Sequence, residues 1–284
     1  MKPRQPGKAL QVNFIYYSRR SKNVLKIRCL RGGKRLNSNA SDDERSEGSP
    51  LSVETKKLTL MAVLAAVYAI GSFLPGFPLL GVPGSKIDIV RSLEMAYGFI
   101  LGPVYGPMTA FLGAVVGKLM TGGGFGMYFT PLALVSSFTA ACLMRRELLR
   151  VRGWMLSAGV LSALIGGWYI LPAGRVVPLY PVLHFAALGI VILLGGRITE
   201  YLRSDDRRRL SIGVALSSYS STMAGHMLGN LIFILLLSPS PLFFMGILPV
   251  SAAERLVLTA LSTAIATPLI LIMRNVYPEL MEDD

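Results

Sequence analysis

Long apolar runs recur along most of this chain, and they constrain its fold more than any other feature. Eight such segments can be drawn, at residues 58–75, 90–102, 104–121, 127–145, 154–171, 181–200, 211–237 and 254–274. A run of about 20 apolar residues can cross a bilayer as a helix, and no alternating strand pattern appears. Only 16% of the 284 residues are charged, against about 25% in soluble domains. We therefore predict an all-α polytopic membrane protein with about eight helices.

The second and third segments are separated only by the sequence GPVYGP at residues 102–107. Proline removes a backbone donor and glycine readily adopts turn conformations, so this stretch disfavours a continuous helix. It predicts a tight turn between two antiparallel helices. The sequence GGGFG at 122–126 has no following Lys–Ser/Thr pair and no preceding strand. It is therefore expected to be a flexible connection and not a phosphate-binding loop.

Positive charge is distributed unevenly along the chain. The formal net charge is +13, and residues 1–57 alone hold 14 Lys and Arg against 5 acidic residues. Other basic clusters lie at 145–152 and 197–209, after the fourth and sixth segments, and Arg274 follows the eighth. Because short basic loops stay in the cytoplasm, this pattern indicates a multi-pass protein of the cell membrane with both termini cytoplasmic. The excess charge lies mostly outside the apolar segments, so we do not expect nucleic-acid binding.

The N-terminal region differs from the rest of the chain. Residues 38–50 are polar and acidic, as in disordered segments, and no apolar signal-peptide core is present. We expect residues 1–56 to be a disordered basic cytoplasmic tail and residues 57–284 to be the transmembrane domain. Two alternatives are a true translation start near residue 51 and a tail that binds anionic lipid headgroups.

Several polar side chains lie inside the apolar segments, where a charge costs ~2.5–3.5 kcal/mol at a helix centre and usually faces a cavity. They gather toward the expected outer ends of the segments, with aromatic side chains at the same depth. This clustering predicts a polar pocket that opens outward. The candidate substrate-binding residues are Arg91, Glu94, Tyr128, Trp168, His226, Asn230 and Glu254.

Most of these residues also have a structural explanation. Arg91 and Glu94 could pair across one helical turn, and Glu254 could cap the start of the eighth helix. Lys118 could extend to the membrane surface, and His226, which lies between two glycines, could simply pack against another helix. The case for a pocket therefore depends on the convergence of these residues and not on any one of them.

Known catalytic and metal-binding patterns are absent from the sequence. There is no HExxH, no GxSxG and no Walker motif, and the two cysteines, Cys29 and Cys142, form no CxxC or Cys/His pair. We therefore expect neither an enzyme, nor a metal site, nor a bound cofactor. If transport by this protein consumes ATP, other subunits have to hydrolyse it.

Four stretches together resemble the substrate-binding S component of energy-coupling factor (ECF) transporters. They are TKKLTLMAVLAAVYAI, RSLEMAYGFILGPVYGPMTAFLGAVVGKL, AGHMLGNLIF and PVSAAERLVLTALSTAIATPLI. The resemblance covers residues 56–145 and 211–275. It implies a six-helix core that captures a vitamin or related small molecule from outside the cell. It also implies a transmembrane T component and ATPase subunits as partners, all of them separate chains.

The resemblance suggests a role for the small residues of the first helix. Ala62 and Ala66 match the AxxxA motif by which S components dock on their T component, and Ala65 with Ala69 repeats the spacing. Small residues allow a close approach of another helix. The alternative is that these alanines contact another helix of the same chain.

One departure from the family pattern concerns the number of helices. Removing residues 154–203 from the eight segments leaves the six helices of an S component, so we interpret this stretch as a candidate inserted hairpin. Two other functions remain open, a self-sufficient proton-coupled secondary transporter and a non-transporting membrane scaffold. In the first of these, His226 or Glu94 would carry the coupling protons.

Overall fold

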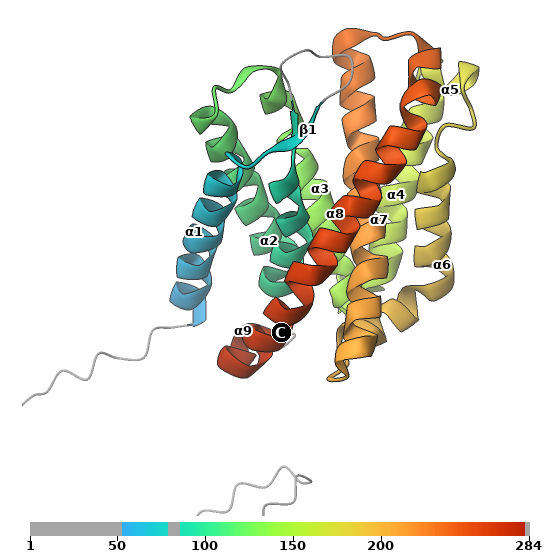
Figure 1. Cartoon of the computed structure of the whole chain (residues 1–284). Coiled ribbons are helices and arrows are strands. Elements are labelled where there is room, and N and C mark those ends of the chain that lie inside the picture. The colour runs from blue at the N-terminus through green and yellow to red at the C-terminus, as the bar shows by residue number, and fades with distance from the viewer. Residues whose placement is uncertain (1–52, 79–85, 282–284) are drawn as a thin grey trace, which may run out of the picture. The chain divides into compact units, whose positions relative to one another are not determined.

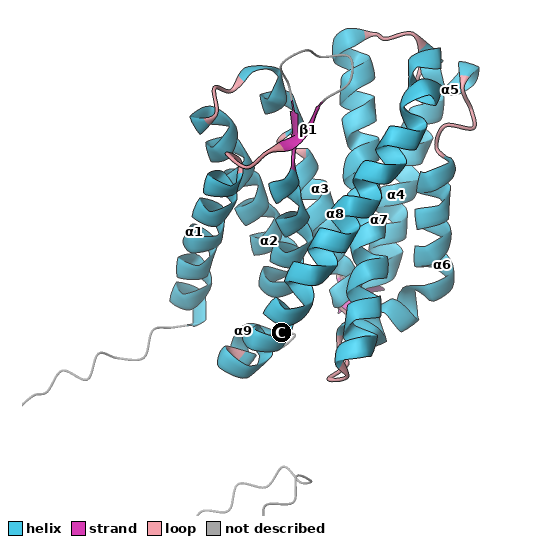
Figure 2. Cartoon of the chain, viewed as in Figure 1, coloured by secondary structure: helices cyan, strands magenta, loops and turns pink. Residues whose placement is uncertain are grey.

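The computed structural model describes residues 53–78 and 86–281. These residues form a bundle of helices with two very short β-hairpins (Figures 1 and 2). Six helical stretches are long and apolar enough to cross a membrane: Ile89–Met120, Gly124–Met144, Gly153–Ile170, Val182–Leu202, Arg207–Leu237 and Pro241–Val276. The prediction of an all-α polytopic membrane protein is confirmed.

The helices follow one another in an antiparallel arrangement around a common core. In order they are α1 (Val53–Gly71), α2 (Leu93–Met120), α3 (Leu132–Met144), α4 (Gly153–Ile170), α5 (Pro172–Val176), α6 (Val182–Leu202), α7 (Arg207–Leu237), α8 (Pro241–Val276) and α9 (Pro278–Met281). Two 3-10 turns, Ile89–Ser92 and Gly124–Phe129, lead into α2 and α3. Strands β1 (Gly76–Pro78) and β2 (Lys86–Asp88) pair antiparallel between α1 and α2, and β3 (Glu147–Leu148) pairs with β4 (Val151–Arg152) between α3 and α4.

The predicted tail lies almost entirely outside the described residues. The last four of its residues, 53–56, belong to α1, which begins at Val53 and not after residue 56. The expected boundary at 56/57 falls inside α1, one turn after its first residue. Glu54 and Lys56 occupy the first turn of this helix, where polar side chains remain outside an apolar segment.

Helix α2 reverses direction at Gly102, as the GPVYGP sequence predicts. Gly102 has a φ of +78°, which interrupts the helical backbone and which glycine adopts without steric cost. A β-carbon at Gly106 would lie only 2.7 Å from the carbonyl oxygen of Tyr97, so the two arms pack back to back. The first arm, residues 93–101, and the second arm, residues 103–120, are thus antiparallel. With these two arms, the predicted eight apolar segments each have a helical counterpart.

The last long helix begins earlier than the sequence suggests. We expected it to start near Glu254, but α8 runs from Pro241 to Val276 and contains Pro249 and Pro268. Glu254 therefore lies in the middle of the helix and does not cap its start. Proline is tolerated inside a membrane helix because neighbouring groups satisfy the freed backbone carbonyl. The helix consequently carries Phe243 and Phe244 in its first turn.

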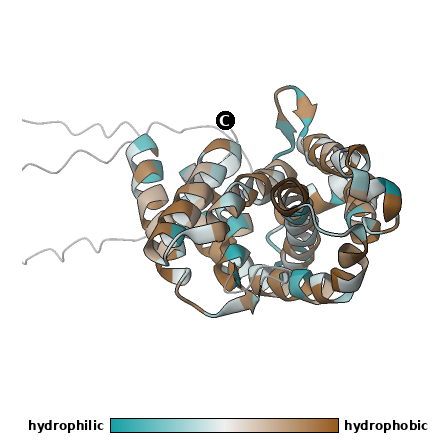
Figure 3. Cartoon of the chain, turned by 90° about the horizontal axis from the view of Figure 1, so that it is seen from above, coloured by the Kyte–Doolittle hydropathy of each residue, from teal (hydrophilic) through white to brown (hydrophobic). Residues whose placement is uncertain are grey.

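The stretch 154–203 is an integral part of the bundle. Its helices α4 and α6 are joined to α3 by buried hydrogen bonds, from Ser157 to the carbonyl oxygen of Thr139 (2.9 Å) and from Thr199 to that of Leu143 (2.9 Å). A β-carbon at Gly195 would lie 2.6 Å from Cβ of Trp154, so α4 and α6 also approach each other closely. Many large apolar side chains elsewhere on the bundle are exposed, as expected for a surface covered by lipid. Figure 3 shows apolar residues, in brown, on helices throughout the bundle.

The basic segments meet at one end of the bundle, the lower end in Figure 1. The guanidinium of Arg274 donates to the carbonyl oxygens of Leu202 and Ser204, which ties the end of α8 to the α6–α7 connection. Lys56 forms an ion pair of 2.7 Å with Glu279 of α9 at the start of α1. The loops that the sequence marks as basic therefore share one side of the molecule.

Candidate functional site

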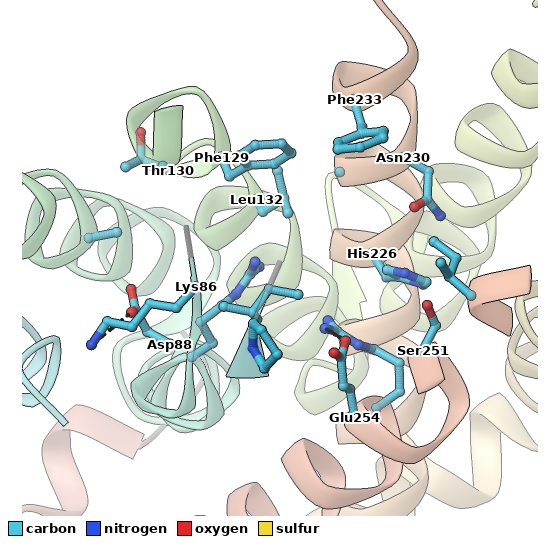
Figure 4. A pocket seen from close by; sticks show the side chains of 18 of the residues that line it. Lys86, Asp88, Phe129, Thr130, Leu132, His226, Asn230, Phe233, Ser251 and Glu254 are labelled. Carbon is cyan, nitrogen blue, oxygen red and sulfur yellow. Dashed lines mark hydrogen bonds and ion pairs between the residues drawn. The ribbon is translucent and has the colours of Figure 1, made fainter. Parts of the chain in front are cut away.

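A cavity opens at the end of the bundle opposite the basic loops, between α1, α2, the β1–β2 hairpin, the start of α3, α7 and α8. It encloses about 1000 Å³, including its mouth. Five of the seven predicted site residues line it: Arg91, Glu94, His226, Asn230 and Glu254. Figure 4 shows Lys86 and Asp88 on one side of this space and His226, Asn230, Ser251 and Glu254 on the other. The predicted convergence of polar residues is thus present in the fold.

On the α2 side, the charged groups are engaged with one another. Nε of Arg91 lies 3.1 Å from Oε1 of Glu94, and the hydroxyl of Tyr68 donates to the same oxygen at 2.9 Å. The side chain of Glu94 is only 2% exposed. The pairing considered for Arg91 and Glu94 is therefore confirmed, and Tyr68 extends it to α1. This network joins α1 to α2 as well as lining the cavity.

A second ion-pair group lies nearby at the β1–β2 hairpin. Asp88 is buried and accepts from Lys118 at 2.5 Å, with Lys86 at 3.7 Å. Lys86 also donates to the backbone carbonyl oxygens of Ser72 and Leu74. Lys118 thus points to Asp88 and does not extend to the membrane surface. Sequence analysis did not identify Asp88, because it falls in a stretch expected to be a loop, where an acidic residue is usually solvated; the structure places it at the end of β2.

The α7–α8 side is less completely paired. His226 and Asn230 are one helical turn apart on α7, and Glu254 and Arg255 are adjacent on α8. The Arg255 guanidinium, although buried, makes one long hydrogen bond among the described residues, to Glu254 at 3.5 Å. Nε of Arg255, Nδ2 of Asn230 and Nδ1 of His226 are buried and have no hydrogen-bond partner in that part of the chain. This side of the cavity therefore has buried polar atoms that remain available to a ligand.

Aromatic side chains complete the lining. Phe233 of α7 stacks on Phe243 of α8 with ring centroids 5.6 Å apart, and Phe129 and Phe244 also face the space. Such rings offer a flat apolar surface beside the charged groups. Sequence analysis did not identify this set, because Phe243 and Phe244 fall in a stretch expected to be a loop.

The two predicted stacking residues do not line the cavity. Trp168 is fully buried, with its ring 4.7 Å from that of Tyr180 and 5.0 Å from that of Phe244. It therefore supports the lining from behind. Tyr128 is 57% exposed and its ring contacts Phe125. The prediction that both residues line the cavity depends on their similar depth in the membrane, and depth does not determine which way a side chain points.

The alanines of α1 fall on two different faces. Ala69 is 3% exposed and packs beside Gly117 of α2, and Ala65 packs beside Gly113. These two residues are therefore internal contacts, which corrects the expectation that they form a partner interface. Ala62 and Ala66 lie on the exposed face of α1, with Val63 and Val67. Of the four alanines this pair is exposed, whereas Ala65 is half-buried and Ala69 is buried.

Comparison with known proteins gives little further information. The chain is 26% identical over 208 residues to an uncharacterized protein of Methanocaldococcus jannaschii, and the alignment covers 72% of this chain and 68% of that protein. No protein-family profile and no solved structure matches the chain. Among the described residues, no group of three or more His, Cys, Asp or Glu side chains is arranged to hold a metal ion.

Proposed function

We propose that this protein is the substrate-capture subunit of an ECF-type importer, binding a vitamin or related small molecule in the cavity between α2, α7 and α8. The observation that carries the proposal is the cavity itself. Its charged groups and phenylalanines come from helices far apart in sequence, and a concave site that combines apolar rings with a few polar groups is typical of sites for small organic ligands.

The position of the basic loops supports capture from outside the cell. Lys56, Arg274 and the α6–α7 connection lie at the opposite end of the bundle from the cavity. If the basic end faces the cytoplasm, as the positive-inside rule favours, the cavity opens outward in the cell membrane and both termini are cytoplasmic. Cysteine labelling of Glu147→Cys, at an exposed site of the α3–α4 connection, and of Ser204→Cys in intact cells tests this orientation. Both sites should resist an impermeant reagent, and labelling of either one would reverse it.

Two further features support a multi-subunit importer. The sequence contains no Walker motif for ATP hydrolysis, so ATP-driven uptake requires ATPase subunits. The exposed face of α1 presents Ala62 and Ala66, where the backbone of a partner helix, such as one of a T component, can approach closely.

Matched substitutions on the two faces of α1 test the partner proposal. Ala66→Leu adds bulk to the exposed face, so it should weaken co-purification with the T component and ATPase subunits without lowering the melting temperature. Ala69→Leu adds the same bulk against Gly117, so it should lower the melting temperature of the isolated protein. Equal complex recovery for wild type and Ala66→Leu would contradict docking through this face.

The capture function is tested by native mass spectrometry of the full chain purified in mild detergent. A small molecule that remains bound to the folded protein is expected. Uptake by the purified protein alone in vesicles, driven by a proton gradient, would favour the secondary transporter instead. Absence of both a bound molecule and transport would leave a membrane scaffold as the best description.

A further inference from the structure

The cavity carries one more cationic than anionic side chain. Its four cations and three anions are Lys86, Arg91, Lys118, Arg255, Asp88, Glu94 and Glu254. A buried net charge is unfavourable without a compensating group, because low-dielectric surroundings solvate it poorly. The cavity is therefore electrostatically suited to a ligand that carries a negative charge.

Pairing leaves the extra positive charge with the two lysines at Asp88, and Arg255 is the buried cation whose donors are least completely used. Arg91 is paired with Glu94 at 3.1 Å, and Asp88 lies between two lysines. Arg255 is 1% exposed, yet its guanidinium reaches Glu254 only at 3.5 Å. A guanidinium has five N–H donors arranged in a planar fork, which suits the oxygens of a carboxylate or phosphate.

Other buried polar atoms that lack hydrogen-bond partners in the described part of the chain lie on the same α7–α8 side of the cavity. Nδ2 of Asn230 and Nδ1 of His226 are buried and lack a hydrogen-bond partner among the described residues, as does Nε of Arg255. Buried polar groups are nearly always hydrogen-bonded, so these three atoms, like Oδ1 of Asp88 across the cavity, require a partner. One bound group with oxygen acceptors would satisfy the free donors of both Arg255 and Asn230.

Residues of the 154–203 stretch hold this wall in place from behind. The ring of His184 stacks on that of His226 with centroids 5.2 Å apart, and Tyr180 packs between Trp168 and Phe244. Burial raises the pKa of the Tyr180 hydroxyl, which therefore stays protonated. Its oxygen also has no hydrogen-bond partner in the described part of the chain. Tyr180 and His184 are thus positioning residues for the α7–α8 wall.

We propose that the captured molecule is an amphiphilic anion whose carboxylate or phosphate oxygens bind Arg255 and Asn230. Its apolar ring packs on the stacked pair Phe233 and Phe243. This inference rests on the capture function proposed above and deepens it by naming the ligand class. The stretch 154–203 acts on ligand binding through His226 and Asn230, and does not line the cavity itself.

Four probes that share one ring and differ in their head group test the ligand class. They are benzoate, phenyl phosphate, benzamide and benzylamine, titrated into the full chain at millimolar concentration. The readout is Trp168 fluorescence in a Trp154→Phe background, because the chain has two tryptophans and Trp168 contacts the cavity residue Phe244. Benzoate or phenyl phosphate should give a saturable change, and the one that binds identifies a carboxylate or a phosphate ligand. Benzamide and benzylamine should give no change.

Variants of the wall confirm where the anion binds. Arg255→Met should weaken binding of the anionic probe at least tenfold, and Glu254→Gln/Arg255→Met removes both charges should the single variant be poorly folded. Tyr180→Phe keeps the ring that packs behind the wall and removes only a hydroxyl without a hydrogen-bond partner in the described residues, so it should change binding by less than about twofold. Arg175→Met, at an exposed site, is the control and should change nothing.

Three outcomes would overturn the inference. They are binding of benzamide equal to that of benzoate, binding unaffected by Arg255→Met, and no response to either anion, which would mean that the unpaired atoms hold only water. Native mass spectrometry separates these results from failure of the capture function. A retained neutral or cationic molecule would preserve capture and reject the anion, whereas absence of any retained molecule would reject both.

Discussion

The two walls of the cavity contrast in how their charges are satisfied. On the α2 side, Arg91, Glu94 and Tyr68 form a closed network in which each group finds a partner. On the α7–α8 side, Arg255 and Asn230 retain buried donors without partners among the described residues. A charge that is fully paired within the protein contributes to the fold, whereas an unpaired buried donor is available to a ligand. The contrast assigns different roles to two walls that look alike in sequence.

The largest effect on stability is expected at the closed network. Arg91→Met leaves the Glu94 carboxylate buried without its cation, and breaking a buried pair in this way costs roughly 3–5 kcal/mol. The melting temperature in detergent should fall sharply. Arg175→Met is the control for loss of one arginine. A melting temperature equal to that of wild type would mean that the α2 wall is not structural, and the contrast between the walls would disappear.

A smaller and different effect is expected on the opposite wall. Asn230→Ala removes a buried amide whose Nδ2 has no protein partner in the described part of the chain, so the fold should lose little. Affinity for the retained small molecule should fall about tenfold, which corresponds to ~1.4 kcal/mol. Parallel measurement of binding and melting separates the two effects. A sharp fall in the melting temperature without a change in affinity would mean that Asn230 stabilises the fold and does not bind the ligand.

The smallest effect is expected at the exposed ion pair of the basic end, which serves as a reference for both walls. The hydrogen bond from Lys56 holds the pKa of Glu279 below its usual range. Its stabilisation is therefore present above the ordinary carboxyl pKa and is lost as the pH falls through the lowered value. Because about a third of each side chain is exposed, water screens the pair, and Glu279→Gln should barely change the melting temperature at neutral pH. A fall as large as that of Arg91→Met would show that exposure is a poor guide to the role of charges in this protein.

The sequence predicts the membrane class and the helices well, because apolar length and the Gly-Pro turn at 102–107 act locally. It also identifies Arg91, Glu94, His226, Asn230 and Glu254 as a convergent set, since polar groups in apolar segments seek one another. Sequence analysis fails where the role of a residue depends on the direction of its side chain or on tertiary packing. Trp168 has the right depth but the wrong direction.

Each of the remaining errors depends on tertiary packing, which local sequence patterns do not report. The start of α8 at Pro241 was hidden by Pro249, which normally interrupts a helix in water. The two faces of α1 could not be separated from spacing alone, because Ala65 and Ala66 differ by a single residue and only packing against Gly113 distinguishes them. Asp88 could be recognised as part of the cavity only from its ion pair with Lys118, and the sequence does not reveal that pairing.

One measurement tests the contrast between the walls most directly. Two double variants each remove one ion pair and leave the net charge unchanged: Arg91→Met/Glu94→Gln on the α2 wall and Glu254→Gln/Arg255→Met on the α8 wall. Native mass spectrometry of both, alongside wild type, reports how much of the retained small molecule each folded protein carries. The α2 variant should keep the molecule and the α8 variant should lose it. Equal retention by both variants, or loss from the α2 variant alone, would contradict the assignment of the α7–α8 wall as the binding surface.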